Sequence, residues 1–125
     1  ELGLEYNIQS VAYDRWNASQ LVIDLQNEGA NMSPFGQGFL SMSAPTKELE
    51  KLILGEKIIH DGNPVINWML SNVALQEDAA GNLKVNKQKS SDKVDGIVAL
   101  IMSLGEHMTT EDINSVYDNR GLLIL

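Results

Sequence analysis

Two aspartates, Asp14 and Asp95, stand where a carboxylate is unusual. Asp14 ends the apolar run at residues 11–13, which reads as a buried strand, and a buried carboxylate is costly unless a cation or hydrogen bonds compensate it. Asp95 falls in the expected first turn of a helix, beside Gly96, where another segment or a ligand can come close. Carboxylates from a strand end and a helix start can converge on Mg²⁺ or Mn²⁺, which prefer oxygen ligands. The pair therefore predicts a divalent-metal site.

Each aspartate also has a purely structural explanation. Asp14 can pair with the neighbouring Arg15 or cap the helix that follows. Asp95 can be favoured by the helix macrodipole, which stabilises acids in a first turn. Taken singly, the two positions are explained by these roles. The metal hypothesis depends on the two side chains meeting in the folded chain.

Four of the nine basic residues fall in the ten-residue window "KVNKQKSSDK", namely Lys84, Lys87, Lys89 and Lys93. The net charge of −8 argues against a nucleic-acid-binding surface on average, because phosphate contacts need local positive charge. An isolated run of this kind is typical of a solvated loop. A functional role is expected only if the lysines lie beside a reactive site. The window lies just before Asp95, one of the two predicted metal ligands.

Other chemistries have little support. The chain has no cysteine, which excludes disulfides and thiolate metal sites, and its two histidines, His60 and His107, lack zinc-ligand spacing. His60 is expected to form a hydrogen bond in a turn. The "GQG" at residues 36–38 lacks the remainder of a phosphate-binding loop. Trp16 and Trp68 are expected to pack in the core or against another domain.

The elements that must position Asp14 and Asp95 are read from periodicity and capping signals. The amino-terminal half predicts a strand at 8–13, then a helix capped by Asn17 and stopped by Gly29. A strand-to-loop segment is expected at 31–43. The next helix is expected to start between Ser43 and Thr46, with Pro45 in its first turn, and to end at Gly55. The second half predicts a helix capped by Asn63 with Pro64 first, a hairpin at 73–86, a helix from about Ser91, and a short turn capped by Thr110 before an apolar strand.

This order of elements predicts one mixed α/β domain over residues 1–125. The predicted strands are short and not numerous enough to form a stable sheet, so further strands are expected upstream. No apolar stretch is long enough to span a bilayer, and the first residues, "ELGLEYN", do not resemble a signal peptide. A soluble protein with no membrane contact is expected.

Four segments carry a family resemblance: "VAYDRWNASQLV", "PFGQGFLSMSAPTKELEKLI", "HDGNPVINWMLSNV" and "KSSDKVDGIVALIMSL". Together with the ending "SVYDNRGLLIL" they resemble the carboxy-terminal nuclease domain of the large terminase subunit of tailed bacteriophages. The resemblance extends from about residue 8 to the end of the chain. The motifs are long and stand in the family's order and spacing.

The resemblance implies an RNase H-like mixed sheet flanked by helices, and a metal-dependent endonuclease that cuts concatemeric viral DNA during packaging. Asp14 matches the family's acid on a later strand and Asp95 its helix acid, and both would hold Mg²⁺ or Mn²⁺ in a two-metal site. The first-strand acid has no counterpart, so this fragment is expected to be inactive or weak alone. Lys84, Lys87, Lys89 and Lys93 would bind double-stranded DNA, with Lys93 nearest the scissile phosphate.

The implied partners are the protein's own amino-terminal ATPase domain, the small terminase subunit and the portal protein, in the cytoplasm of the bacterial host. No membrane takes part. Two alternatives stay open. One is another RNase H-like nuclease, such as a junction resolvase. The other is a non-catalytic assembly module that binds a partner through its acidic surface.

Overall fold

The computed structural model describes residues 2–16 and 19–119, with side chains as far as residue 113. Helices and short strands alternate along these residues. In chain order they are α1 (Leu2–Glu5), β1 (Val11–Tyr13), α2 (Ser19–Asn27), β2 (Met32–Pro34), α3 (Phe39–Leu54), α4 (Pro64–Asn72), β3 (Leu75–Glu77), β4 (Leu83–Val85) and α5 (Asp95–Asn119). The mixed α/β class predicted from the sequence is confirmed. Within the described ranges, no helix is both long and apolar enough to cross a membrane.

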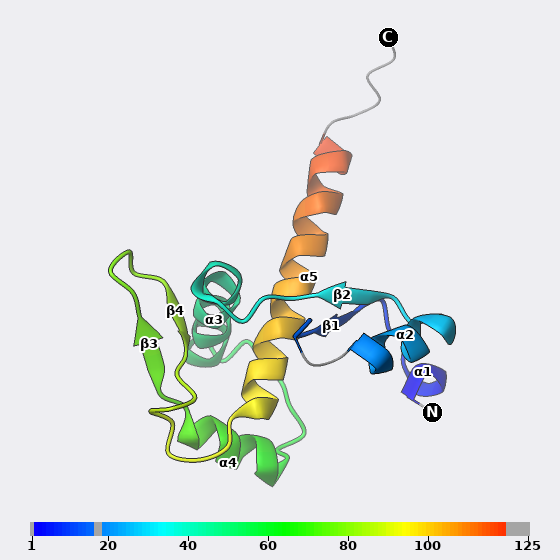
Figure 1. Cartoon of the computed structure of the whole chain (residues 1–125). Coiled ribbons are helices and arrows are strands. Elements are labelled where there is room, and N and C mark those ends of the chain that lie inside the picture. Colours follow the sequence, from blue (N-terminus) through cyan, green and yellow to red (C-terminus); the bar gives the residue numbers. More distant parts are fainter. Residues whose placement is uncertain (1, 17–18, 120–125) are drawn as a thin grey trace.

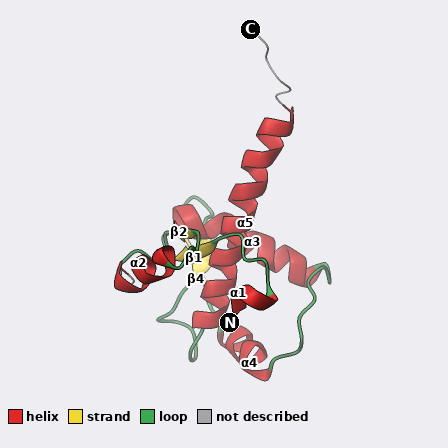
Figure 2. Ribbon diagram, turned by 90° about the vertical axis from the view of Figure 1, so that its right-hand side faces the viewer, coloured by secondary structure: helices red, strands yellow, loops and turns green. Residues whose placement is uncertain are grey.

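The long helix α5 organises the structure (Figure 1). On one side of it lie α3 and the β3–β4 hairpin, and on the other lie β1 and β2 with the helices α1 and α2. The carboxy-terminal part of α5 extends beyond the other elements, also after rotation by 90° (Figure 2). The amino-terminal half of α5 therefore carries most of the packing.

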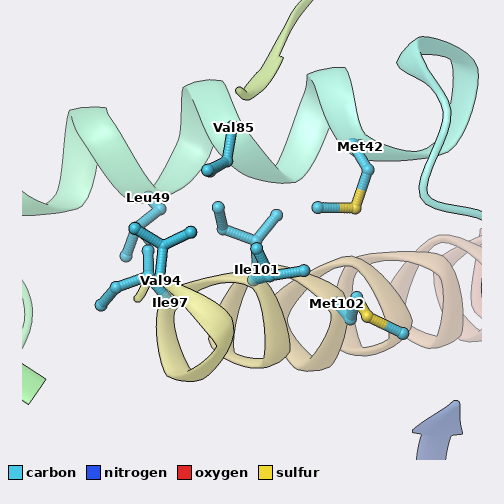
Figure 3. Packing of buried hydrophobic residues seen from close by; sticks show 8 residues of the cluster. Met42, Leu49, Val85, Val94, Ile97, Ile101 and Met102 are labelled. Atoms are coloured by element: carbon cyan, nitrogen blue, oxygen red, sulfur yellow. The ribbon is translucent and has the colours of Figure 1, made fainter. Parts of the chain in front are cut away.

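The hydrophobic core lies between α3 and α5 (Figure 3). Ile101 is its most deeply buried side chain, with 1% of its surface exposed. Apolar residues at helical spacing on α5 face those on α3, and β4 adds one valine, so three elements close one core. Its buried members are Met42, Leu49, Val85, Val94, Ile97, Val98, Ile101 and Met102.

The described strands form two small sheets instead of one mixed sheet. β1 and β2 are parallel, with Ala12 opposite Ser33, and α2 is the crossover between them. β3 and β4 are antiparallel, with Gln76 opposite Lys84, which confirms the predicted hairpin. The two sheets are separate, and they lie on opposite sides of α5 in Figure 1.

Several local predictions are confirmed by hydrogen bonds or backbone angles. The Asn63 side chain caps α4 by accepting a bond from the Val65 N–H (2.9 Å). His60 Nδ1 accepts the Gly62 N–H at 3.0 Å, the role expected for this histidine. Gly29 follows the end of α2, as predicted, and its φ of 92° is a backbone conformation that L side chains rarely adopt.

The predicted start of the second helix is wrong. α3 begins at Phe39, and Pro45 lies inside it. The polar residues that resembled a helix start have other partners. Ser43 Oγ accepts the Leu83 N–H of β4 at 3.1 Å, and Thr46 Oγ1 donates to the Met42 carbonyl at 2.6 Å. Pro45 is buried against α5, so tertiary packing compensates the backbone hydrogen bond that proline cannot make.

The boundaries predicted for the last helix also need correction. α5 begins at Asp95, with the carbonyl of Val94 accepting the Ile97 and Val98 N–H groups. Thr110 is not a cap, because α5 continues past it to Asn119. Its hydroxyl donates to the Glu106 carbonyl one turn back at 3.0 Å and is thus satisfied within the helix.

Two further predictions concern the tryptophans and the chain segments outside the described residues. Trp16 is 83% and Trp68 45% exposed, so the core position expected for them is wrong. Packing on another domain stays a prediction. The Asn17 cap and the apolar strand expected at the carboxy terminus lie outside the described residues.

Candidate functional site

Asp14 is the first residue after β1, as the sequence predicted. The Tyr13 carbonyl accepts the Phe35 N–H at 2.8 Å, so strand pairing ends directly before the aspartate. Asp14 is half-buried, and its Oδ1 accepts the Trp16 N–H at 3.3 Å. Among the described residues no ion pair joins it to Arg15. An ion pair with Arg15 therefore does not compensate the charge of the Asp14 carboxylate.

Asp95 is the first residue of α5, and its side chain is 68% exposed. Its Oδ1 lies 3.2 Å from Nζ of Lys87. The following Gly96 allows a close approach of α4, because a Cβ at this position would lie 2.7 Å from Sδ of Met69. The Gly96 N–H points to that same sulfur at 3.3 Å. The helix start that carries Asp95 is thus seated on α4.

Asp14 and Asp95 line the same hollow, which has a volume of about 390 Å³. One wall is the strand segment 10–14, and the other is the face of α5 that carries Asp95 and Ala99. Gln37 and Lys87 complete the lining. The folded chain therefore brings together two aspartates that are 81 positions apart in the sequence.

The donor set of this hollow suits a hard divalent cation in type. Carboxylate oxygens are the ligands that Mg²⁺ and Mn²⁺ prefer, and both aspartates supply them. The number of donors is small: within the described part of the chain, no group of three or more acidic or histidine side chains could hold a metal ion. The residues present fit part of a metal site, and a two-metal centre needs at least one more acid.

The four lysines occupy different positions around the hollow. Lys87 is in it, and Lys93 shares an adjoining hollow of about 290 Å³ with Lys87 and Asp95. Lys84 is half-buried, with Nζ 4.8 Å from the centre of the Phe39 ring. Lys89 is exposed. Lys87 is the lysine in direct contact with a predicted ligand.

A second hollow, of about 310 Å³, adjoins the first toward the β3–β4 hairpin. The two hollows share Gln37, Lys87 and Val98 and are therefore neighbours; together they are called the groove below. The added lining is mostly polar and includes Gln76 and Lys84. Sequence reasoning missed Gln37. Its only local signal is the pair of flanking glycines, Gly36 and Gly38, which do not match the pattern of a phosphate-binding loop.

Fold and groove together define a small mixed α/β domain with paired carboxylates between a strand end and a helix start. Residues 2–111 match the family described as "Terminase large subunit, endonuclease domain", and the chain belongs to this family. The resemblance inferred from the sequence motifs is confirmed.

The relatives are longer proteins. The chain is 36% identical over 103 residues to the large terminase subunit of Enterobacteria phage HK97, covering 81% of this chain and 20% of that protein. It is 37% identical over 109 residues to protein YmfN of Escherichia coli K12, covering 85% and 24%. The crystal structure of the HK97 large terminase superposes with a TM-score of 0.76 at 34% identity, covering 84% and 22%. The chain thus spans about a fifth to a quarter of these proteins.

Proposed function

We propose that this chain is the nuclease part of a phage-type terminase and acts as an endonuclease on concatemeric viral DNA during genome packaging. The observation that carries the proposal is the hollow shared by Asp14 and Asp95, in a chain of the terminase endonuclease family. An RNase H-like sheet, to which β1 and β2 contribute two strands, is part of this proposal. The reaction takes place in the cytoplasm of the bacterial host.

Asp14 and Asp95 are the residues that would hold Mg²⁺ or Mn²⁺. The chemistry that such ions would supply here is activation of a water for attack on the scissile phosphorus and stabilisation of the leaving 3′ oxygen. Two carboxylates are few for a two-metal site, so a further acid completes it in the longer protein. The isolated chain is accordingly inactive or weakly active. Asp95 is 68% exposed at this hollow, so a phosphodiester could reach it from solvent.

The chain's own cations bind the DNA backbone. Lys87 sits in the groove and Lys93 in the adjoining hollow, both next to Asp95. Lys84 lines the groove farther along, and Lys89 is exposed in the same loop. Lysine contacts to phosphates position a duplex without reading its sequence. The acidic remainder of the surface then repels DNA and restricts binding to this face.

The remaining partners follow from the size of the relatives. Because this chain spans only 20% of the HK97 large terminase, other segments of such a protein accompany it. We propose an amino-terminal ATPase domain in the same polypeptide, and the small terminase subunit and the portal protein as assembly partners.

The test is Mn²⁺-dependent cleavage of plasmid DNA by the longest gene product that contains this chain. Asp14→Asn and Asp95→Asn keep the side-chain shape but remove the charge. Each is expected to lower the cleavage rate by more than the roughly 10–100-fold that follows loss of an outer-shell partner of a metal. Asp112→Asn, at an exposed position of the same helix α5, is the matched control and should cleave normally.

Unchanged cutting by both aspartate variants would show the metal assignment to be wrong. If the wild-type protein bound no divalent ion in calorimetry, the non-catalytic assembly module would replace the endonuclease. A resolvase-like nuclease would instead cleave four-way junctions in preference to linear or plasmid DNA.

A further inference from the structure

The carboxylate of Glu106 holds both strands of the parallel sheet. Ser10 Oγ donates a hydrogen bond to Oε1 at 2.8 Å, and Ser33 Oγ donates to Oε2 at 2.8 Å. Ser10 directly precedes β1, and Ser33 is the central residue of β2. Each carboxylate oxygen thus has its own strand. All three side chains are partly buried, which strengthens such charge-assisted bonds relative to exposed ones.

Glu106 also lies on the face of α5 that carries Asp95. About three turns of 3.6 residues separate the two, so they point to nearly the same side of the helix. Ser10 and Asp14, which flank β1, lie on the same side of the extended segment, because alternate residues of a strand share a side. Ser10 and Asp14 both line the hollow with Asp95. The contact between Glu106 and Ser10 therefore joins the two faces that carry the predicted metal ligands.

The other contacts between β1 and α5 do not define their relative position as sharply. Ala12 packs against the core cluster, but apolar contact is not directional and tolerates sliding. Beside this contact lies the 390 Å³ hollow, where the strand and the helix are not packed on each other. The two short, directional hydrogen bonds to the Glu106 carboxylate tie the sheet to the helix at two defined points.

We propose that Glu106 is a positioning residue that aligns Asp14 with Asp95 through Ser10 and Ser33. The inference rests on the proposed metal-dependent nuclease. Glu106 itself does not touch the substrate or the ion. Its loss lets the sheet shift on α5, and a displacement of about 1 Å at a reacting centre can lower a rate by about 100-fold.

The experiment compares Glu106→Ala with Glu106→Gln in the longest gene product that contains this chain. The amide of glutamine can accept a bond from one serine and donate one to the other, so it preserves the link. We expect Glu106→Ala to raise the dissociation constant for Mn²⁺ about tenfold, measured by calorimetry without DNA. The kcat for plasmid cleavage falls while KM for DNA is unchanged, and Glu106→Gln restores most of both losses.

Glu111→Ala is the matched control, because Glu111 is an exposed acid on the same helix, 3.3 Å from His107. It should bind Mn²⁺ like the wild type. A purely structural role for Glu106 would reduce the folded fraction and leave the Mn²⁺ affinity of the folded molecules unchanged. That result overturns the proposal.

Ser10→Ala and Ser33→Ala keep the proposal testable if Glu106→Ala does not fold. Each removes one of the two bonds, and each is expected to weaken Mn²⁺ binding several-fold. Wild-type Mn²⁺ affinity in both folded serine variants contradicts the positioning role. Failure of the nuclease proposal is recognised separately, because Asp14→Asn and Asp95→Asn would then leave Mn²⁺ binding unchanged.

Discussion

Replacing Gly105 by alanine is expected to destabilise the fold, although alanine is the better helix former. Gly105 lies in the middle of α5 and is buried. A Cβ there would lie 2.5 Å from Cζ and 2.8 Å from Cε2 of Phe35, and 3.1 Å from Cγ of Pro45. Both neighbours are ring atoms, and they cannot yield by a simple rotation of a flexible chain end. The substitution therefore forces the Phe35 ring or the packing of α3 to move.

The magnitude follows from two opposing terms. Alanine gains about 1 kcal/mol over glycine in a helix interior. Overpacking of a well-filled site costs about 1–3 kcal/mol, and the upper part of that range applies because the contacts to Phe35 are shorter than real Cβ contacts. The expected net loss is about 1–2 kcal/mol in the free energy of unfolding. At a urea m-value of about 1.5 kcal/mol/M, the midpoint falls by roughly 1 M.

The assay is urea denaturation followed by far-UV circular dichroism, with Gly96→Ala as the matched control. At Gly96 the nearest atoms are Sδ of Met69 and Cδ1 of Ile66, which lie at or next to the ends of flexible side chains and can move aside, so the cost is smaller. Combining Gly105→Ala with Phe35→Leu should recover part of the lost free energy of unfolding, because leucine lacks the ring atoms Cζ and Cε2 that contact the new methyl group. A Gly105→Ala protein as stable as the wild type, with no coupling to Phe35, refutes this description of the packing.

Substitutions at three further positions test the core, the cap of α4 and the hairpin turn by the same denaturation assay. Ile101→Ala should cost about 2–5 kcal/mol, because Ile101 is fully buried between α3 and α5; a loss under 1 kcal/mol would contradict this core. Asn63→Ala should cost about 1 kcal/mol by removing the cap of α4, while Asn63→Asp should retain it. Asp78→Ala should destabilise the protein at pH 7 and have little effect at pH 2. Hydrogen bonds from the side chain and backbone of Asn82 lower the pKa of Asp78. The ionised carboxylate therefore stabilises the fold above its ordinary pKa of 3.8, and this contribution is lost as the pH falls below that value.

Local signals predicted those elements whose ends depend on nearby residues. The Asn63–Pro64 start of α4 and the hairpin turn closed by Asp78 and Gly81 are stabilised within a few residues, so their sequence patterns are sufficient. Asp14 at the end of β1 and Asp95 in the first turn of a helix were predicted for the same reason. These positions belong to one element each.

The same local signals were misleading for three polar residues that resemble helix caps but lie inside helices. Ser43 and Thr46 have the residue types of a helix start, yet Ser43 bonds β4 and Thr46 bonds its own helix. Thr110 resembles a cap, but it lies within α5. Ser43 has a partner 40 positions away, about which periodicity carries no information. Thr46 and Thr110 each donate to the carbonyl one turn back, so a residue type that favours caps is satisfied in the helix interior.

The sequence by itself determined the class of the domain, its family motifs and the two aspartates, because these depend on residue type, order and spacing. The tertiary structure decided that Asp14 and Asp95 line one hollow, that Lys87 is the lysine at Asp95, and that Glu106 joins β1 and β2 to α5. These relations depend on how a sheet and a helix dock. Docking depends on contacts between residues that are far apart in the sequence: Glu106 is 73 positions from Ser33 and 96 positions from Ser10. Such contacts leave no periodic signal in the sequence.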